Sequence, residues 1–185
     1  MTEQTSIVVS LGRTGEEMFQ RNREQTLFID CMGAICSLSI GVALAVGESK
    51  PVIALDSDGS HLMDLSLLST LGVLANDLNN LTILVLDNEI YESGGGMPSR
   101  YSHLNWALLG KAWGLRIIEV STIEELSIAF SDYPKRFLYI IVKIKNDKTI
   151  DTFTKDIDGI ESRYRFQRHL QKILNKKIVD PAIKG

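Results

Sequence analysis

The sequence predicts an α/β fold, a doubly wound parallel sheet with helices on both faces. Short β-rich apolar runs alternate with helical patterns along its 185 residues, which is the order of parallel βαβ units. The runs at residues 52–55 and 81–86 each end in polar side chains, as in sheets that bind ligands at the carboxyl ends of their strands. No internal repeat or linker interrupts the alternation. We therefore expect a single domain over residues 1–185, with residues 151–185 as a C-terminal helical extension.

In the first half of the chain, β-branched runs are followed by longer stretches with helical character. Residues 7–9, Ile-Val-Val, predict a strand, and residues 15–23 follow as a helix. Residues 27–29 predict a second short strand. The stretch 35–46 is apolar but interrupted by serines and a glycine, which indicates a buried helix that neighbours approach closely. A strand at residues 52–55 comes next.

The second half continues the same alternation. Residues 62–76 carry apolar side chains at helical spacing and predict a helix, before the strand at residues 81–86. A helix at residues 104–113 is expected to end at Gly114, because glycine suits the left-handed cap. The remaining expected elements are a strand at 117–120, a helix at 123–130, a strand at 137–144 and a helix at 161–174.

The composition is that of a globular protein, with 44% hydrophobic and 23% charged residues. A net charge of −3 argues against a nucleic-acid partner, which needs a basic face. No run reaches the roughly 18 apolar residues that span a membrane. The N-terminal residues lack the basic and apolar pattern of a signal peptide, so we expect no membrane and a cytoplasmic location. Cys31 and Cys36 stand beside small and apolar residues and are expected to be buried thiols.

Asp58 and Asn88 are the clearest candidates for a ligand site, because each follows the end of a predicted strand. A carboxylate and an amide oxygen facing one crevice suit Mg²⁺, which takes the rest of its oxygen ligands from phosphates and water. Gly59 and Ser60 begin a turn into a helix, where backbone N–H groups and the Ser60 hydroxyl can bind phosphate oxygens. An ordinary helix N-cap is the alternative for Ser60. His61 is a candidate acid or base, with a surface or structural histidine as the alternative.

Residues 57–60, Ser-Asp-Gly-Ser, followed by Asn88 after the next strand, resemble the signature of thiamine-diphosphate-dependent enzymes, which is Gly-Asp-Gly and then Asn. Residues 32–34 and 40–45 are similar to the segment that precedes this signature. Residues 88–99, NEIYESGGGMPS, resemble the segment that follows it in phosphonopyruvate and sulfopyruvate decarboxylases. The resemblance implies the diphosphate-binding domain of this superfamily.

The resemblance also implies roles for further residues in binding thiamine diphosphate and Mg²⁺. The backbone carbonyl of Ile90 would be a third metal ligand, and Met32 would support the cofactor in its bent conformation. Core packing is the alternative for Met32, and a solvated surface charge is the alternative for Arg13. The other implied cofactor-binding residues are Gly12, Arg13, Thr14, Asp30, Gly33, Ser57, Gly59, Ser60, Tyr91 and Ser93. Ser57 stands where the family has glycine.

The segment 91–96 is too rich in glycine for a packed element and is expected to be a mobile active-site loop. Within it, Glu92 is an acid–base candidate, with a solvent-facing loop glutamate as an equal rival. Arg100, a few residues further on, is a candidate contact for an anionic substrate or an ordinary solvated arginine.

In this superfamily a pyrimidine-binding domain across a subunit interface supplies the catalytic glutamate, and the sequence has no second α/β domain to carry it. The resemblance therefore implies the β subunit of a hetero-oligomeric 2-oxo acid decarboxylase, whose α subunit supplies that glutamate. The small anionic substrate would be phosphonopyruvate or sulfopyruvate, and the products an aldehyde and CO₂. An acetolactate-type carboligase subunit and a noncatalytic binding or regulatory module remain alternatives. An iron–sulfur oxidoreductase is disfavoured, because its cluster needs about four cysteine ligands.

Overall fold

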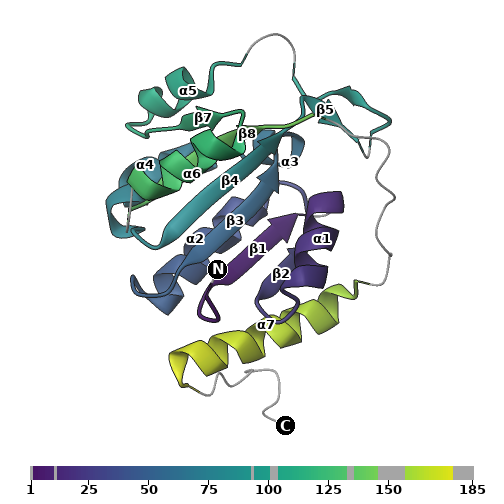
Figure 1. Ribbon diagram of the computed structural model, residues 1–185, viewed down its shortest axis with the longest axis vertical. Helices are drawn as coiled ribbons and strands as arrows, with labels where there is room; N and C mark the ends of the chain where they lie inside the picture. Colours follow the sequence, from purple (N-terminus) through teal and green to yellow (C-terminus); the bar gives the residue numbers. More distant parts are fainter. Residues whose placement is uncertain are drawn as a thin grey trace.

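A six-stranded parallel sheet forms the centre of the computed structural model, with strand order β2-β1-β3-β4-β8-β7 (Figure 1). The structure describes residues 2–10, 12–92, 94–100, 104–132, 136–145 and 157–176. Its strands are β1 (Ser6–Ser10), β2 (Thr26–Ile29), β3 (Val52–Ser57), β4 (Leu81–Asp87), β7 (Ile118–Val120) and β8 (Leu138–Lys143). Every neighbouring pair in this sheet is parallel, which confirms the predicted fold class.

The helices lie between and after these strands in the chain and cover both faces of the sheet. They are α1 (Arg13–Arg21), α2 (Ile35–Val46), α3 (Asp58–Leu62), α4 (Leu67–Leu74), α5 (Trp106–Ala112), α6 (Ile123–Asp132) and α7 (Gly159–Leu174), with a 3-10 turn η1 (Ala75–Asp77). Among the described residues no helix combines the length and the apolar character that crossing a bilayer requires. The described part of the expected C-terminal extension, residues 157–176, contains α7.

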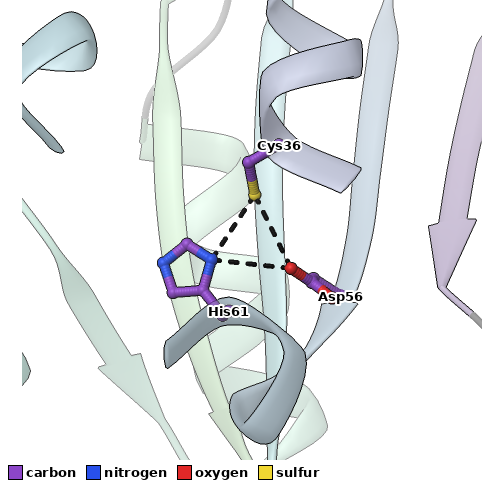
Figure 2. A group of neighbouring side chains, drawn as sticks. All are labelled: Cys36, Asp56 and His61. Carbon is purple, nitrogen blue, oxygen red and sulfur yellow. Dashed lines mark hydrogen bonds and ion pairs between the residues drawn. The ribbon is translucent and has the colours of Figure 1, made fainter. Parts of the chain in front are cut away.

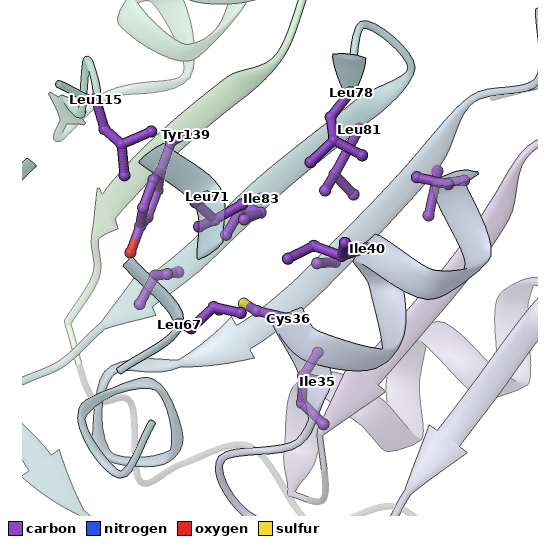
Figure 3. Packing of buried hydrophobic residues seen from close by; sticks show 14 of the residues in the cluster. Ile35, Cys36, Ile40, Leu67, Leu71, Leu78, Leu81, Ile83, Leu115 and Tyr139 are labelled. Atoms are coloured by element: carbon purple, nitrogen blue, oxygen red, sulfur yellow. The ribbon is translucent and has the colours of Figure 1, made fainter. Parts of the chain in front are cut away.

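Alternating side chains of the strands divide the core between the two faces. Val8 and Tyr139 lie in the cluster formed with α2 and α4, whereas Ile7 packs on the α1 side and Ile140 on the α6 side. Figure 3 shows the larger cluster, in which Ile40 of α2, Leu71 of α4, Ile83 of β4 and Tyr139 of β8 take part. Period-two alternation in buried strands thus places apolar side chains on both faces of the sheet.

Helix α7 covers the outer strand β2. The Ser162 hydroxyl accepts a hydrogen bond from the Phe28 N–H at 3.0 Å, so a side chain satisfies a backbone donor of this edge strand. Further along the helix, His169 Nε2 lies 3.2 Å from Ser6 Oγ of β1. Covering an edge strand with a helix hinders its pairing with another chain.

The predicted helix at residues 62–76 is wrong in its bounds, because the structure divides it. Helix α3 already begins at Asp58, since the Ser57 side chain accepts from Ser60 N at 3.4 Å and is the N-cap. Ser60 is therefore not the cap. The Asp64 carboxylate then accepts from the hydroxyls of Ser37 and Ser66, and such side-chain hydrogen bonds compete with helix continuation. The chain becomes helical again at Leu67.

Two smaller expectations also need correction. Tyr91 is not part of a loop but pairs with Met97 in the antiparallel hairpin β5 (Ile90–Tyr91) and β6 (Met97–Pro98), with the glycines forming its turn. Cys31 is exposed because it lies in the connection after β2 rather than inside α2, whereas Cys36 is buried as expected.

Candidate functional site

Four predicted segments follow the carboxyl ends of four adjacent strands. Residues 30–33 follow β2, residues 12–14 follow β1, residues 57–60 end β3 and begin α3, and residues 88–91 follow β4. The chain leaves β1 toward β2 and later continues from β3 toward β4, so the winding direction changes between β1 and β3. Ligand sites of open parallel sheets lie at this kind of switch point.

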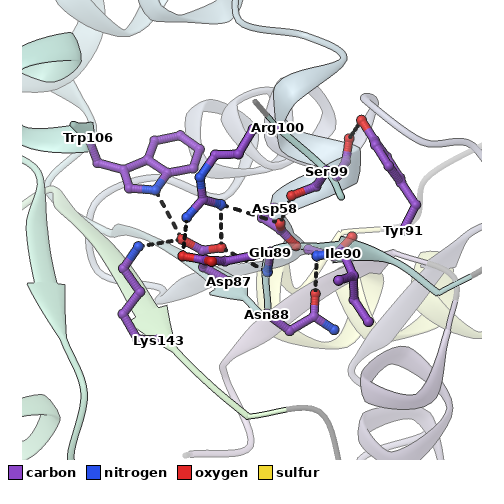
Figure 4. A network of polar contacts seen from close by, with 12 residues as sticks. Asp58, Asp87, Asn88, Glu89, Ile90, Tyr91, Ser99, Arg100, Trp106 and Lys143 are labelled. Atoms are coloured by element: carbon purple, nitrogen blue, oxygen red, sulfur yellow. Dashed lines mark hydrogen bonds and ion pairs between the residues drawn. The ribbon is translucent and has the colours of Figure 1, made fainter. Parts of the chain in front are cut away.

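Asp58 is completely buried at the first residue of α3. Its Oδ2 accepts a hydrogen bond from the Ser99 hydroxyl and lies 3.6 Å from the Arg100 guanidinium (Figure 4). Its Oδ1 has no hydrogen-bond partner among the described residues. Burial raises the pKa of Asp58 above its ordinary value, and the Ser99 hydrogen bond only partly offsets this. A buried carboxylate oxygen without a partner fits a divalent cation, because a charge out of water needs a compensating charge.

Asn88 and Ile90 form a tight turn directly after β4. The Asn88 Oδ1 accepts from the Ile90 N–H at 3.2 Å, and Glu89 between them has a φ of 65°, a left-handed conformation uncommon for a residue other than glycine. The amide oxygen keeps a second lone pair for another partner. Strained backbone of this kind is concentrated at ligand sites. Glu92 is exposed, and its carboxylate accepts from Asn88 Nδ2 at 3.4 Å.

Gly59 and Tyr91 bring the end of β3 against the hairpin. The Tyr91 hydroxyl donates to the Gly59 carbonyl at 3.3 Å. A β-carbon at position 59 would lie only 2.6 Å from Tyr91 Cδ1, so any side chain here would have to displace the Tyr91 ring. Ser60 is buried, and its hydroxyl accepts from the Gly33 N–H at 3.0 Å, which holds the segment after β2 against the signature. The structure thus brings Gly33, Ser60 and Tyr91 together around Gly59.

The other predicted cofactor-binding residues lie at the same edge of the sheet. Gly12 precedes α1 with a φ of 105°, a conformation that favours glycine, and Arg13 and Thr14 form the first turn of that helix. Asp30 is exposed after β2, and Met32 is half-buried. Ser93 lies outside the described residues.

His61 is buried and faces the interior rather than the strand-end residues. Its ring lies close to Cys36 and Asp56 (Figure 2). Its Nε2 also contacts the Tyr139 hydroxyl. These neighbours favour a structural role for His61 over the acid–base role considered from the sequence.

A network around Asp87 is the part of the site that sequence reasoning missed. Asp87 is buried, and its carboxylate accepts from Arg100 at 2.7 Å, from Lys143 at 2.6 Å and from Trp106 at 3.1 Å (Figure 4). Burial acts to raise the pKa of Asp87, but these hydrogen bonds outweigh it and the pKa is lowered. Arg100 also binds Glu89 at 2.7 Å, so it is paired with carboxylates rather than solvated. The position of Asp87 at a buried strand end, directly before Asn88, was the available signal.

These features define a class: doubly wound α/β domains with a ligand site at the strand-end switch point, here with a buried carboxylate available to a cation. Comparison with known families narrows this class. The family model described as thiamine pyrophosphate enzyme, C-terminal TPP binding domain, matches residues 10–136. The chain belongs to this family.

Individual relatives share this region or more. A sulfopyruvate decarboxylase subunit beta from Methanocaldococcus jannaschii is 30% identical over 92% of this chain and 90% of its own length. The protein of the same name from Methanococcus maripaludis is 33% identical over 90% of this chain and 89% of its own length. A phosphonopyruvate decarboxylase from Streptomyces viridochromogenes is 33% identical over 68% of this chain, but this match covers only 32% of that protein. The match thus spans about a third of the phosphonopyruvate decarboxylase.

Proposed function

We propose that this chain is the β subunit of a heteromeric thiamine-diphosphate-dependent decarboxylase that acts on sulfopyruvate or phosphonopyruvate. The observation that carries the proposal is the match over about nine-tenths of both chains with proteins named sulfopyruvate decarboxylase subunit beta. Because these relatives are named as β subunits, the match supports a second, partner subunit for this chain. The proposed α partner binds the pyrimidine ring and supplies the catalytic glutamate, and the complex works as a cytoplasmic hetero-oligomer.

The residues of the site fit the proposed Mg²⁺ and diphosphate. Asp58 offers a buried oxygen without a partner, and Asn88 offers an amide oxygen. With the carbonyl of Ile90, they form an all-oxygen set of the kind that Mg²⁺ accepts when phosphate and water complete its coordination. Gly59 and the first turn of α3 present backbone at the position proposed for the diphosphate.

Thiamine diphosphate, when bound, supplies the electron sink for loss of CO₂ from a 2-oxo acid. The chain's own residues bind and orient the cofactor. Tyr91 closes over Gly59, and Gly33 is held against Ser60, so segments from three strands are fixed around the signature. Glu92 is the proposed acid–base group of this chain, because it is exposed at the hairpin and contacts Asn88. Gly12, Arg13, Thr14, Asp30, Met32, Ser57 and Ser93 complete the proposed cofactor contacts.

Native mass spectrometry of the tagged chain, purified gently from its own cells in Mg²⁺ buffer, tests this proposal. We expect a complex with a second protein that carries thiamine diphosphate. The purified complex should then release CO₂ from sulfopyruvate or phosphonopyruvate. A second 2-oxo acid added as acceptor separates decarboxylation from the acetolactate-type reaction. A homo-oligomer without cofactor would contradict the proposal and favour a noncatalytic module.

A further inference from the structure

A buried cluster of three potential metal ligands lies behind the signature, on the interior side of α3. Cys36 comes from α2, Asp56 from β3 and His61 from α3, and each residue is at most 2% exposed. Cys36 Sγ lies 3.5 Å from His61 Nδ1 and 3.9 Å from Asp56 Oδ2, and His61 Nδ1 lies 3.6 Å from Asp56 Oδ2 (Figure 2). Three ligand atoms from three elements thus form a nearly equilateral triangle.

The size of this triangle matches a tetrahedral metal ion. Zinc binds thiolate sulfur at about 2.3 Å and imidazole or carboxylate atoms at about 2.0–2.2 Å, so ligand atoms at tetrahedral angles lie roughly 3.3–3.6 Å apart. The observed separations of 3.5, 3.6 and 3.9 Å need only a small contraction. Three protein ligands leave a fourth position to water.

Two of the three ligands already have partners that orient them. Asp56 Oδ1 accepts from the Ser57 N–H at 2.9 Å, which directs Oδ2 toward the cluster. His61 Nε2 contacts the Tyr139 hydroxyl, which leaves Nδ1 for the cluster. A histidine that binds a metal through one nitrogen and contacts an oxygen group through the other is typical of metal sites.

Without a cation, Asp56 Oδ2 has only distant polar partners in this cluster. Asp56 is buried, and its Oδ2 lies 3.6 Å from His61 Nδ1 and 3.9 Å from Cys36 Sγ, both long for hydrogen bonds. A buried carboxylate oxygen whose partners are this distant is poorly stabilised, and a bound cation would stabilise it.

We propose that Cys36, Asp56 and His61 bind one divalent transition-metal ion, of which Zn²⁺ is the best match. The sulfur and imidazole ligands select a transition metal, whereas the all-oxygen set at Asp58 and Asn88 selects Mg²⁺, so the two sites take different ions. The ion ties together α2, β3 and α3, the helix that begins at Asp58. Its role is to hold the short helix that carries the signature, and the site does not depend on the identity of the substrate.

Cobalt incorporation tests this site, because Co²⁺ replaces Zn²⁺ and a bound thiolate gives a charge-transfer absorption in the near ultraviolet. The full chain is produced in Co²⁺-supplemented medium, and the metal content and absorption spectrum are measured. We expect one Co²⁺ per chain and a thiolate charge-transfer band. Cys36→Ser should abolish the band, and His61→Gln should lower the Co²⁺ content at least tenfold. Tyr139→Phe should weaken Co²⁺ affinity by about 10- to 100-fold.

Matched controls locate the ion. Cys31→Ser changes the exposed cysteine and should keep the band, and Asp58→Asn changes the proposed Mg²⁺ site and should keep it as well. Circular dichroism of each variant separates loss of metal from loss of fold. A folded wild-type chain without the band, or a band that disappears with Cys31→Ser and persists with Cys36→Ser, would overturn the proposal and leave the cluster as a hydrogen-bonded network.

Discussion

Tyr91 lies directly over Gly59, with its hydroxyl donating to the Gly59 carbonyl at 3.3 Å and its ring in the space that a side chain at position 59 would need. The contact joins the hairpin after β4 to the start of α3. Asp58 and Asn88 are therefore held near each other in two ways, by the pairing of β3 with β4 and by the packing of Tyr91 on Gly59.

Replacing Gly59 by alanine should push Tyr91 out of this position. We expect Gly59→Ala to lower the free energy of unfolding by about 1–3 kcal/mol, because overpacking forces neighbouring groups to shift. Urea unfolding followed by circular dichroism measures this loss. Gly41→Ala is the matched control, since a β-carbon there meets no atom within 4 Å and alanine favours a helix interior. Equal stabilities for the two variants would contradict the packing relationship.

Ser57 should act through its side-chain cap rather than through special backbone geometry. Its φ of −100° is an ordinary extended value, so the glycine that the family has here is not required by the backbone. We expect Ser57→Ala to cost about 1 kcal/mol of unfolding free energy and Ser57→Gly only a few tenths. Thermal and urea unfolding of the pair give the comparison. An alanine variant as stable as wild type would show that the cap contributes nothing.

The free energy of unfolding should depend on pH through His169, which lies on α7. Burial, assisted by the nearby Lys172 charge, lowers the pKa of His169 below its ordinary value, while Thr5 and Glu24 partly oppose this. The unfolded chain takes up a proton near pH 6.5, whereas the folded chain resists protonation until lower pH. The folded state is therefore favoured above about pH 6.5, and this contribution is lost as the pH falls toward the folded pKa.

The comparison of wild type with His169→Gln isolates this contribution. We expect the unfolding free energy of wild type to fall more steeply than that of the variant between about pH 7 and pH 5, measured by urea unfolding at each pH. Parallel pH profiles for the two proteins would exclude His169 as the titrating group.

Much of the fold could be predicted because its signals are local. The strand at residues 81–86 and the helix at 35–46 follow from composition and length, and the structure places them at Leu81–Asp87 and Ile35–Val46. Asp58 and Asn88 could be assigned to one edge of the sheet because carboxyl ends of parallel strands meet there.

The remaining features depend on contacts between distant residues. The end of α3 is followed by a turn whose Asp64 accepts from Ser37 of another helix, and no local pattern reveals that bond. From the sequence, Arg100 could be a contact for an anionic substrate or an ordinary solvated arginine, and only the tertiary structure places it between Asp58 and Asp87. Similarly, the polar surroundings of His61 come from elements that the chain order separates.

We propose that Asp58 holds the cation through which this chain binds thiamine diphosphate. Calorimetric titration of thiamine diphosphate into the purified complex, with and without Mg²⁺, tests it most directly. We expect Mg²⁺-dependent binding in wild type, at least a tenfold loss in Asp58→Asn, and no change in the control Asp77→Asn, whose carboxyl is exposed. Mg²⁺-dependent binding of unchanged affinity in a folded Asp58→Asn complex would contradict the account.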